Sequence, residues 1–133
     1  MQSAALTYQI IGAAIEVHNL LGPGFLESIY KHALLHELSL RGLRAKTELE
    51  IHIGYKNQSI GKHRLDIIVE DTVVVELKAA NTIAEIHVAQ ALSYLKATDL
   101  ELALILNFGK PSLVWKRLIK SRGLRGLNGF SEG

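Results

Sequence analysis

Two strands are predicted by the stretch His63-Arg-Leu-Asp66-Ile-Ile-Val-Glu-Asp-Thr-Val-Val-Val-Glu76-Leu-Lys78. Apolar residues alternate in each strand, as expected when one face is buried: Leu65, Ile67 and Val69 in the first, and Val73, Val75 and Leu77 in the second. Because a one-residue slip would expose one set, we expect Val69 opposite Val73, Ile67 opposite Val75 and Leu65 opposite Leu77. Residues 70–72 then form the connecting loop.

This register places Asp66 directly opposite Glu76, with Lys78 two residues along the same face. Clustered carboxylates suit Mg²⁺ or Mn²⁺, which keep several waters and accept phosphate oxygens. A lysine beside such an ion can orient a water and stabilise charge on a phosphate. The alternative is a cross-strand charge arrangement on a solvated face, because Asp followed by Glu-x-Lys is a weak pattern on its own.

The flanking sequence predicts one α/β domain over residues 1–120. Apolar residues recur at helical spacing over 4–21, 25–40 and 82–96; the second helix ends at Gly42, and Thr82 with Glu85 forms a capping box for the third. Alternating patterns predict further strands over 43–53, 101–108 and 112–119, with turns at Gly54 and 57–61. Residues 121–133 contain four glycines and no periodicity, so we expect a flexible tail there.

Composition excludes several classes of protein. The 133 residues are 48% hydrophobic and 21% charged, which fits one globular domain. The absence of cysteine excludes a disulfide scaffold, a thiolate zinc site and a cysteine nucleophile. No apolar run approaches the roughly 20 residues that span a bilayer, and the N-terminus does not read as a signal peptide. We therefore expect a cytoplasmic protein without a membrane partner.

Charge is unevenly distributed along the chain. The net charge is only +2, but residues 102–131 contain no acidic residue and six basic ones: Lys110, Lys116, Arg117, Lys120, Arg122 and Arg125. This segment is either a contact for phosphates or a solvated run of charge.

Polar side chains on the predicted helices provide further candidates. Residues 83, 87, 90 and 94 share one stripe of the third helix, and Glu27 lies beside Tyr30 in the first turn of the second. His18 lies on an apolar stripe and is either a hydrogen-bonded core residue or a contact near the substrate. His32 and His36 lack a third ligand for a metal, so we interpret them as surface or core residues.

The segment Gly24-Phe-Leu-Glu27-Ser-Ile-Tyr30 resembles the signature of the GxxExxY protein family, a branch of the PD-(D/E)XK nuclease-like superfamily. The resemblance covers about residues 6–120. It includes Ile15-Glu-Val-His18, Asp66, Val75-Glu76-Leu-Lys78, Gln90-Ala-Leu-Ser-Tyr94 and Asn107-Phe-Gly109. One departure is Leu65, which stands where the name of the motif has proline.

The resemblance implies a restriction-endonuclease-like α-β-β-β-α-β core, with a mixed sheet flanked by helices and an extra N-terminal helix. It implies one or two divalent metals, Mg²⁺ or Mn²⁺, held by Glu27, Asp66, Glu76 and the carbonyl of Leu77. Lys78 would be the catalytic lysine, acting with the three carboxylates. Gln90 and Tyr94 would bind the phosphate or the strand end, and we add Tyr30 and His18 as candidate substrate contacts.

The function expected from the sequence is a metal-dependent nuclease that hydrolyses phosphodiester bonds, with DNA favoured over RNA as the partner and a homo-oligomer left open. One alternative is a catalytically inactive nuclease fold that binds nucleic acid or a protein partner through the basic segment. Retention of Glu27, Asp66, Glu76 and Lys78 favours catalysis, because a binding module needs no metal site. A glycosidase using the two carboxylates is less consistent, because it gives the lysine no role.

Overall fold

The computed structural model describes residues 3–120 and 130–132. Its elements are α1 (Ser3–Leu21), α2 (Glu27–Leu40), β1 (Ala45–Tyr55), β2 (Gln58–Val69), β3 (Val73–Lys78), α3 (Glu85–Lys96), β4 (Leu102–Asn107), β5 (Val114–Ile119) and β6 (Phe130–Glu132). The strands form one mixed sheet in the order β1-β2-β3-β4-β5-β6, in which only the β3–β4 pair is parallel. The α/β fold expected from the sequence is confirmed.

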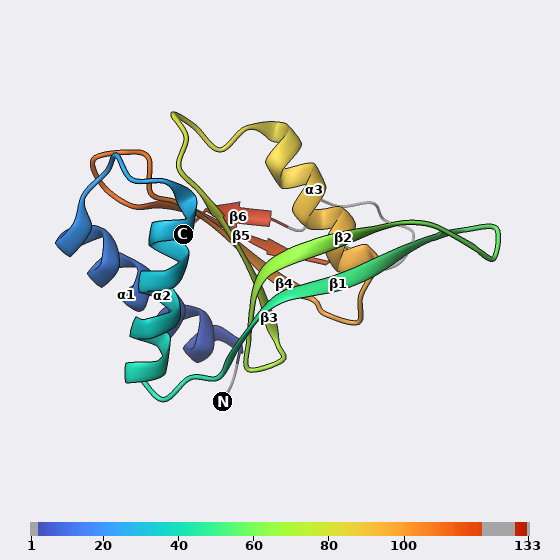
Figure 1. Cartoon of the computed structure of the whole chain (residues 1–133), viewed down its shortest axis with the longest axis horizontal. Coiled ribbons are helices and arrows are strands. Elements are labelled where there is room, and N and C mark those ends of the chain that lie inside the picture. The colour runs from blue at the N-terminus through green and yellow to red at the C-terminus, as the bar shows by residue number, and fades with distance from the viewer. Residues whose placement is uncertain (1–2, 121–129, 133) are drawn as a thin grey trace.

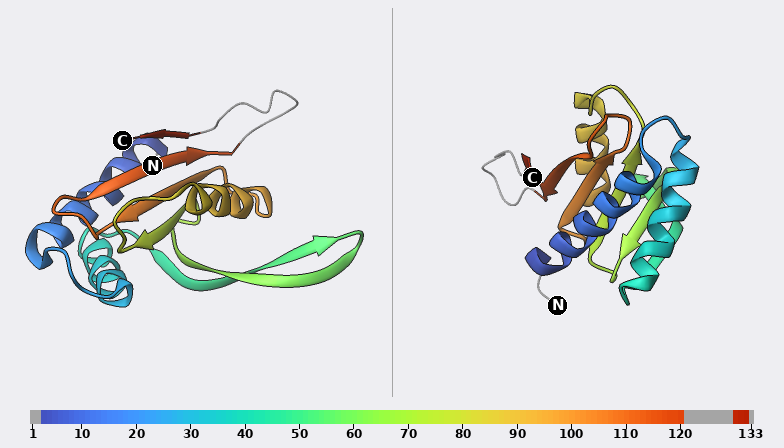
Figure 2. Two further views of the ribbon diagram at one scale, coloured as in Figure 1. Left: turned by 90° about the horizontal axis from the view of Figure 1, so that it is seen from above. Right: turned by 90° about the vertical axis from the view of Figure 1, so that its left-hand side faces the viewer.

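The helices cover both faces of the sheet (Figures 1 and 2). Helices α1 and α2 pack on one face, over side chains that include Ile67, Val75 and Leu104. Helix α3 packs on the other face, over side chains that include Val74 and Ile105. Strands β3 and β4 are therefore buried from both sides, as is typical of parallel strands joined by a crossover helix.

The predicted register of β2 and β3 is confirmed only near their connecting turn. Val69 pairs with Val73 and Ile67 pairs with Val75, where the pairing of the two strands ends. Leu65 does not pair with Leu77: it packs under α3, whereas Leu77 packs under α1 and α2. Strict alternation is thus broken between residues 65 and 67.

The break coincides with an irregularity in β1. Pairing of β1 with β2 passes from Thr47–Ile67 to Leu49–Leu65 and leaves out Glu48, whose φ of 56° lies in the left-handed region. The side chains of β1 change faces across this residue, because Ala45 packs under α1 and α2 whereas Ile51 packs under α3. Beyond this point β1 and β2 continue as a hairpin that leaves the body of the protein (Figure 1).

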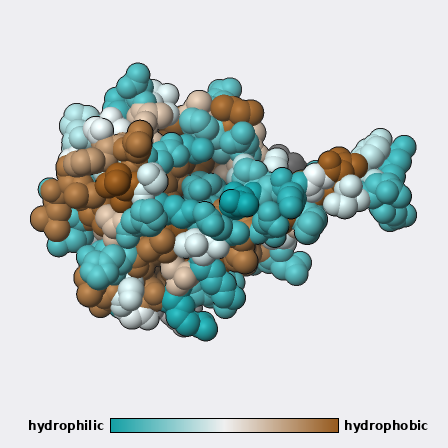
Figure 3. All heavy atoms as spheres, in the orientation of Figure 1, coloured by the Kyte–Doolittle hydropathy of each residue, from teal (hydrophilic) through white to brown (hydrophobic). Residues whose placement is uncertain are grey.

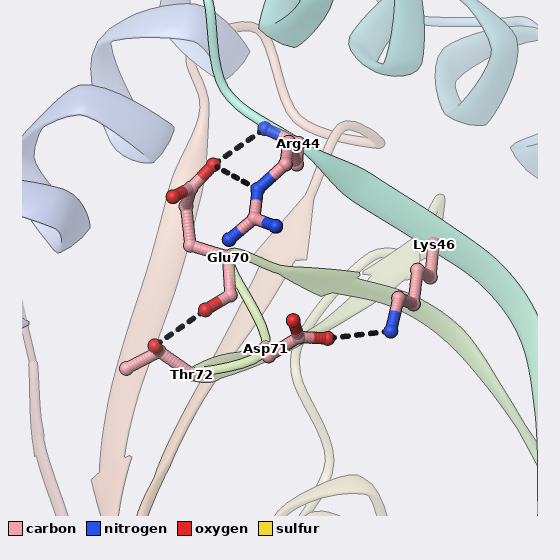
Figure 4. Close-up of polar contacts among 5 residues, drawn as sticks. All are labelled: Arg44, Lys46, Glu70, Asp71 and Thr72. Carbon is pink, nitrogen blue, oxygen red and sulfur yellow. Dashed lines mark hydrogen bonds and ion pairs between the residues drawn. The ribbon is translucent and has the colours of Figure 1, made fainter.

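Ion pairs fasten the turn between β2 and β3 to β1 (Figure 4). The Glu70 carboxylate accepts a hydrogen bond of 2.6 Å from the backbone N–H of Arg44, and Lys46 Nζ lies 2.8 Å from Asp71 Oδ1. Glu70 and Asp71 both have φ of 53°, and Thr72 Oγ1 donates to the Glu70 carbonyl. The side chains therefore support a tight turn in which both central residues are left-handed.

One predicted helix boundary agrees with the structure and another does not. Helix α2 ends at Leu40 and is closed by Gly42 as expected, because Gly42 and Leu43 donate backbone hydrogen bonds to the carbonyls of Ser39 and Leu38. Helix α3 does not begin at a Thr82 capping box: its N-cap is Ala84, whose N–H donates to His87 Nδ1. The chain is still leaving the sheet at Thr82, because Ala80 is held by the side chain of Asn107.

The turn predicted over 57–61 is shorter, because β2 already begins at Gln58. Lys56 and Asn57, with φ of 48° and 68°, make this turn. The expected flexible tail spans residues 121–133. Residues 121–129 and 133 lie outside the described part of the chain, and Phe130–Glu132 instead form β6 beside β5.

The segment after β4 packs closely on the segment after β3. A Cβ placed on Gly109 would overlap the backbone of Ala79 and Ala80. We predict that Gly109→Ala lowers the free energy of unfolding by about 1–3 kcal/mol, the usual cost of overpacking. Urea denaturation followed by the fluorescence of Trp115 measures this change.

Gly61→Ala is the matched control, because a Cβ there meets no atom within 4 Å. Its unfolding free energy should stay within about 0.5 kcal/mol of the wild-type value. Equal urea midpoints for the two variants would contradict the close packing at Gly109.

Candidate active site

The carboxylate of Asp66 lies where β2 separates from β3. Its Oδ2 accepts a hydrogen bond of 3.0 Å from the backbone N–H of Leu77. Pairing with β2 has already ended at Ile67–Val75, so this N–H has no partner from the strand ladder. Asp66 therefore replaces a backbone acceptor and is held beside the carboxyl-terminal end of β3.

Glu76 is the buried acid of the site. Its side chain is 6% exposed, and its Oε1 is buried without a hydrogen-bond partner. The pKa of Glu76 is raised to about 8, chiefly by burial and also by the negative charge of Asp66 and a hydrogen bond with it, whereas the charge of Lys78 lowers it. Glu76 therefore lies within electrostatic range of both Asp66 and Lys78, although Asp66 and Glu76 do not form the predicted cross-strand pair.

Glu27 approaches the same end of β3 from α2. It is exposed in the first turn of the helix, and its Oε2 accepts a hydrogen bond of 3.3 Å from the N–H of Ala79. Asp66 and Glu27 thus hold the N–H groups of residues 77 and 79 in turn. They do not complete a three-carboxylate site: within residues 3–120 and 130–132, no group of three or more His, Cys, Asp or Glu side chains is arranged to hold a metal.

Two aromatic side chains stack beside the carboxylates. Tyr94 of α3 is 9% exposed, and burial raises its pKa to about 12, with smaller contributions from the charges of Glu76 and Asp66. The ring of His63 lies on that of Tyr94, with centroids 3.9 Å apart and planes 18° apart. Gln90 lies one turn earlier on α3 and is exposed.

His63 lies beside the site, although the sequence pattern does not indicate this. Strict alternation places residues 63 and 66 on opposite faces of β2, so the two side chains were not expected near one another. The change of faces between residues 65 and 67 brings His63 to the side of α3. The local signal was weak, because nothing in the β1 sequence marks Glu48 as left-handed.

His18 and Tyr30 are both buried and hydrogen-bonded within the fold, which for His18 is the core alternative left open by the sequence. Tyr30 is fully buried, and its hydroxyl donates 2.6 Å to the Gly22 carbonyl and accepts from the N–H of Phe25. His18 Nε2 lies 2.8 Å from the carbonyl oxygen of Lys110, and both rings stack on Phe108. These contacts hold the loop before Glu27 and therefore position that carboxylate.

Asn107 positions the chain that follows β3. It is fully buried, its Oδ1 accepts from the N–H groups of Ala80 and Gly109, and its Nδ2 donates to the Ala80 carbonyl. The N–H of Phe108 also donates to the Lys78 carbonyl. The end of β3, from Lys78 to Ala80, is thereby fixed by β4 and by the residues after it.

The basic residues of β5 do not share one face of the sheet. Lys116 and Arg117 are neighbours on β5 and point to opposite faces, and Lys116 lines a hollow beside α3. Lys120 Nζ donates 2.8 Å to the Thr98 carbonyl. Arg122 and Arg125 lie outside the described residues. Of the two alternatives for this segment, the contact for phosphates stays a prediction.

The comparison with protein families agrees with this geometry. A family model described as PD-(D/E)XK nuclease superfamily matches residues 4–118. The chain belongs to the PD-(D/E)XK nuclease superfamily. This confirms the resemblance at the level of the superfamily, and membership of the GxxExxY branch stays a prediction. No curated protein and no solved structure matches the chain.

The superfamily membership also accounts for the arrangement of elements. The N-terminal helix α1 precedes a superfamily core that runs from α2 through β1, β2, β3 and α3 to β4.

Among the residues that the structure describes, no helix has the length and apolar character needed to cross a membrane.

PD-(D/E)XK nucleases generally use divalent metals, and the residues present fit such an ion. Glu76 has a buried carboxylate oxygen without a partner, and the carboxylate of Asp66 lies beside it. Such oxygen ligands match Mg²⁺ and Mn²⁺. The carbonyl of Leu77 is a further donor, because in a strand the C=O of a residue points the same way as its N–H, here toward Asp66.

The raised pKa of Glu76 predicts how the stability of the metal-free protein depends on pH. The carboxyl group of Glu76 keeps its proton up to about pH 8 in the folded state, whereas it loses the proton near pH 4.5 in the unfolded chain. The free energy of unfolding should therefore fall as pH rises between these values, by at most about 1.4 kcal/mol per pH unit. Glu76→Gln should flatten this decrease in urea denaturation with EDTA present.

Glu70→Gln is the control for this experiment. The hydrogen bond from the Arg44 backbone holds the pKa of Glu70 below its usual range, so this group does not titrate between pH 5 and pH 8. The pH dependence of Glu70→Gln should match the wild type in that interval. An unchanged slope in Glu76→Gln would contradict the assignment.

Proposed function

We propose that this protein is a metal-dependent nuclease that hydrolyses phosphodiester bonds of DNA. The main supporting observation is the buried, unpartnered Oε1 of Glu76 beside Asp66 and within the electrostatic influence of Lys78. A buried acid without a partner lowers stability, and a bound cation would remove this cost. Membership of the superfamily supports hydrolysis of phosphodiester bonds in general, and DNA as the substrate is part of the proposal.

Each polar residue of the site has a role in this proposal. Asp66, Glu76 and the Leu77 carbonyl would hold Mg²⁺ or Mn²⁺, with Glu27 as the additional ligand from α2. When bound, such an ion neutralises phosphate charge and lowers the pKa of water. Glu27 would first have to release the N–H of Ala79, which lies 3.3 Å from its Oε2.

The remaining residues would act on the phosphate and the nucleophile. The ammonium of Lys78 would orient the attacking water and stabilise the negative charge that develops on the phosphate oxygens. Gln90, which is exposed on α3, would donate to a phosphate oxygen of the bound strand. The hydroxyl of Tyr94 stays protonated throughout the physiological range, because its pKa is raised to about 12, and it could therefore donate as well.

Substitutions test these roles. Asp66→Asn should abolish both Mn²⁺ binding and cleavage. Lys78→Ala should keep the metal but reduce the rate by about 10²–10³, the usual effect of removing one preorganised transition-state group. Gln90→Ala and Tyr94→Phe should have milder effects, through placement of the substrate. The measurements are Mn²⁺ titration and degradation of linear DNA, circular DNA and RNA.

Asp71→Asn is the control, because Asp71 is an exposed carboxylate in the turn of the same hairpin and pairs with Lys46. Its activity should equal that of the wild type. Wild-type protein that binds Mn²⁺ and cuts none of the substrates would instead favour a binding module. Cleavage that survives in Asp66→Asn would place the activity elsewhere.

A further inference from the structure

The outer part of the β1–β2 hairpin has little contact with the body of the protein. We define the arm as residues 50–64, which extend from the body in Figures 1 and 3. Ile51 packs against the core under α3, whereas Tyr55 and Ile60 are 59% and 62% exposed. A two-stranded ribbon without packing is marginally stable in water, so fold stability does not account for the length of the arm.

The arm carries surplus positive charge. Lys56, Lys62 and Arg64 oppose the single carboxylate of Glu50, which gives 3 − 1 = +2, equal to the net charge of the whole chain. Glu50 Oε2 lies 3.4 Å from Lys62 Nζ and 3.7 Å from Arg64 Nη2, so one carboxylate serves two cations. Both cationic side chains are about 60% exposed, and such surface pairs are weak enough for phosphates to compete.

The tip of the arm combines an aromatic ring with a cation. Lys56 Nζ lies 5.4 Å from the centroid of the Tyr55 ring, in the two-residue turn that Lys56 and Asn57 form. An exposed aromatic ring beside a cation is the arrangement on which bases of single-stranded nucleic acid stack while their phosphates are neutralised. This combination favours single-stranded nucleic acid over a protein as the partner.

The arm is continuous with the candidate active site. Its inner end, Arg64, lies two residues before Asp66, and His63 within the arm stacks on Tyr94. We propose that the arm binds single-stranded nucleic acid that runs outward from the active site, with a base stacked on Tyr55 and phosphates on the cations. This proposal rests on the proposed nuclease function and names the form of its substrate.

The length of the arm sets the length of strand that it can engage. From Asp66 to Gln58, at the tip, is eight residues, or about 26 Å at ~3.3 Å per residue. A nucleic-acid strand with bases stacked about 3.4 Å apart covers this distance with roughly eight nucleotides. Contacts at the tip should therefore contribute to the binding of long oligonucleotides and not to that of short ones.

The test is fluorescence anisotropy with labelled single-stranded DNA of 4 and 20 nucleotides, in EDTA so that no cleavage occurs. The double variant Tyr55→Ala/Lys56→Ala should weaken binding of the 20-mer about tenfold, the effect expected for losing one stacked base and one phosphate contact. It should also reduce the salt slope for the 20-mer by about 0.7. Binding of the 4-mer should not change.

Two controls accompany this variant. Tyr8→Ala/Lys31→Ala removes an exposed tyrosine and a lysine from α1 and α2 and should bind both oligonucleotides like the wild type. Double-stranded DNA of 20 base pairs should respond less to the arm variant, because its bases are not free to stack. Urea midpoints of both variants should equal that of the wild type, since three of the four side chains are exposed and that of Lys31 is half-buried.

The outcomes separate the arm from the nuclease. If wild-type protein cleaves DNA with Mn²⁺ and the arm variant binds the 20-mer with unchanged affinity, the arm proposal is overturned and the nuclease stands. If the wild type cleaves nothing while the length-dependent loss is observed, the arm stands without the nuclease. A wild-type dimer that becomes monomeric in the arm variant, with DNA binding unchanged, would assign the arm to self-association instead.

Discussion

The hydrogen bond from the backbone of Leu77 to the carboxylate of Asp66 is the contact on which the site depends. β2 stops pairing with β3 at Ile67, although β3 continues to Lys78. A backbone N–H left without an acceptor at this buried edge would cost free energy comparable to a lost hydrogen bond. Asp66 supplies the acceptor and is thereby placed beside Glu76, so one carboxylate both completes the sheet and forms half of the acidic pair.

The acidic pair is costly in the absence of a cation. Burial and the neighbouring charge both disfavour ionised Glu76, and its Oε1 has no hydrogen-bond partner. Replacement of such a group by an apolar residue of similar volume is often neutral or stabilising in proteins. The chain keeps the acid near the end of its most buried pair of strands. This arrangement is consistent with a site selected for chemistry.

Much of the fold could be predicted from the sequence, because burial on one or both faces leaves a clear periodic pattern. The pairs Val69–Val73 and Ile67–Val75 followed from hydrophobic alternation alone. The face of Leu65 could not be predicted, because it depends on the left-handed backbone of Glu48, a residue type that rarely adopts this conformation. The roles of His18 and Tyr30 also depend on tertiary contacts, with Lys110 and Phe108.

The change of faces at Glu48 separates the hairpin into two mechanically distinct parts. Toward the turn at residues 70–72, the strands are held by packing on both faces of the sheet and by the ion pairs of Arg44 and Lys46. Beyond Ile51 the two strands constrain mainly each other. Residues inserted or removed in pairs beyond this point would leave the register of the core intact and alter only the reach of the hairpin. The scaffold can therefore vary this length in evolution without rebuilding its acidic pair, as surface loops on rigid sheets commonly do.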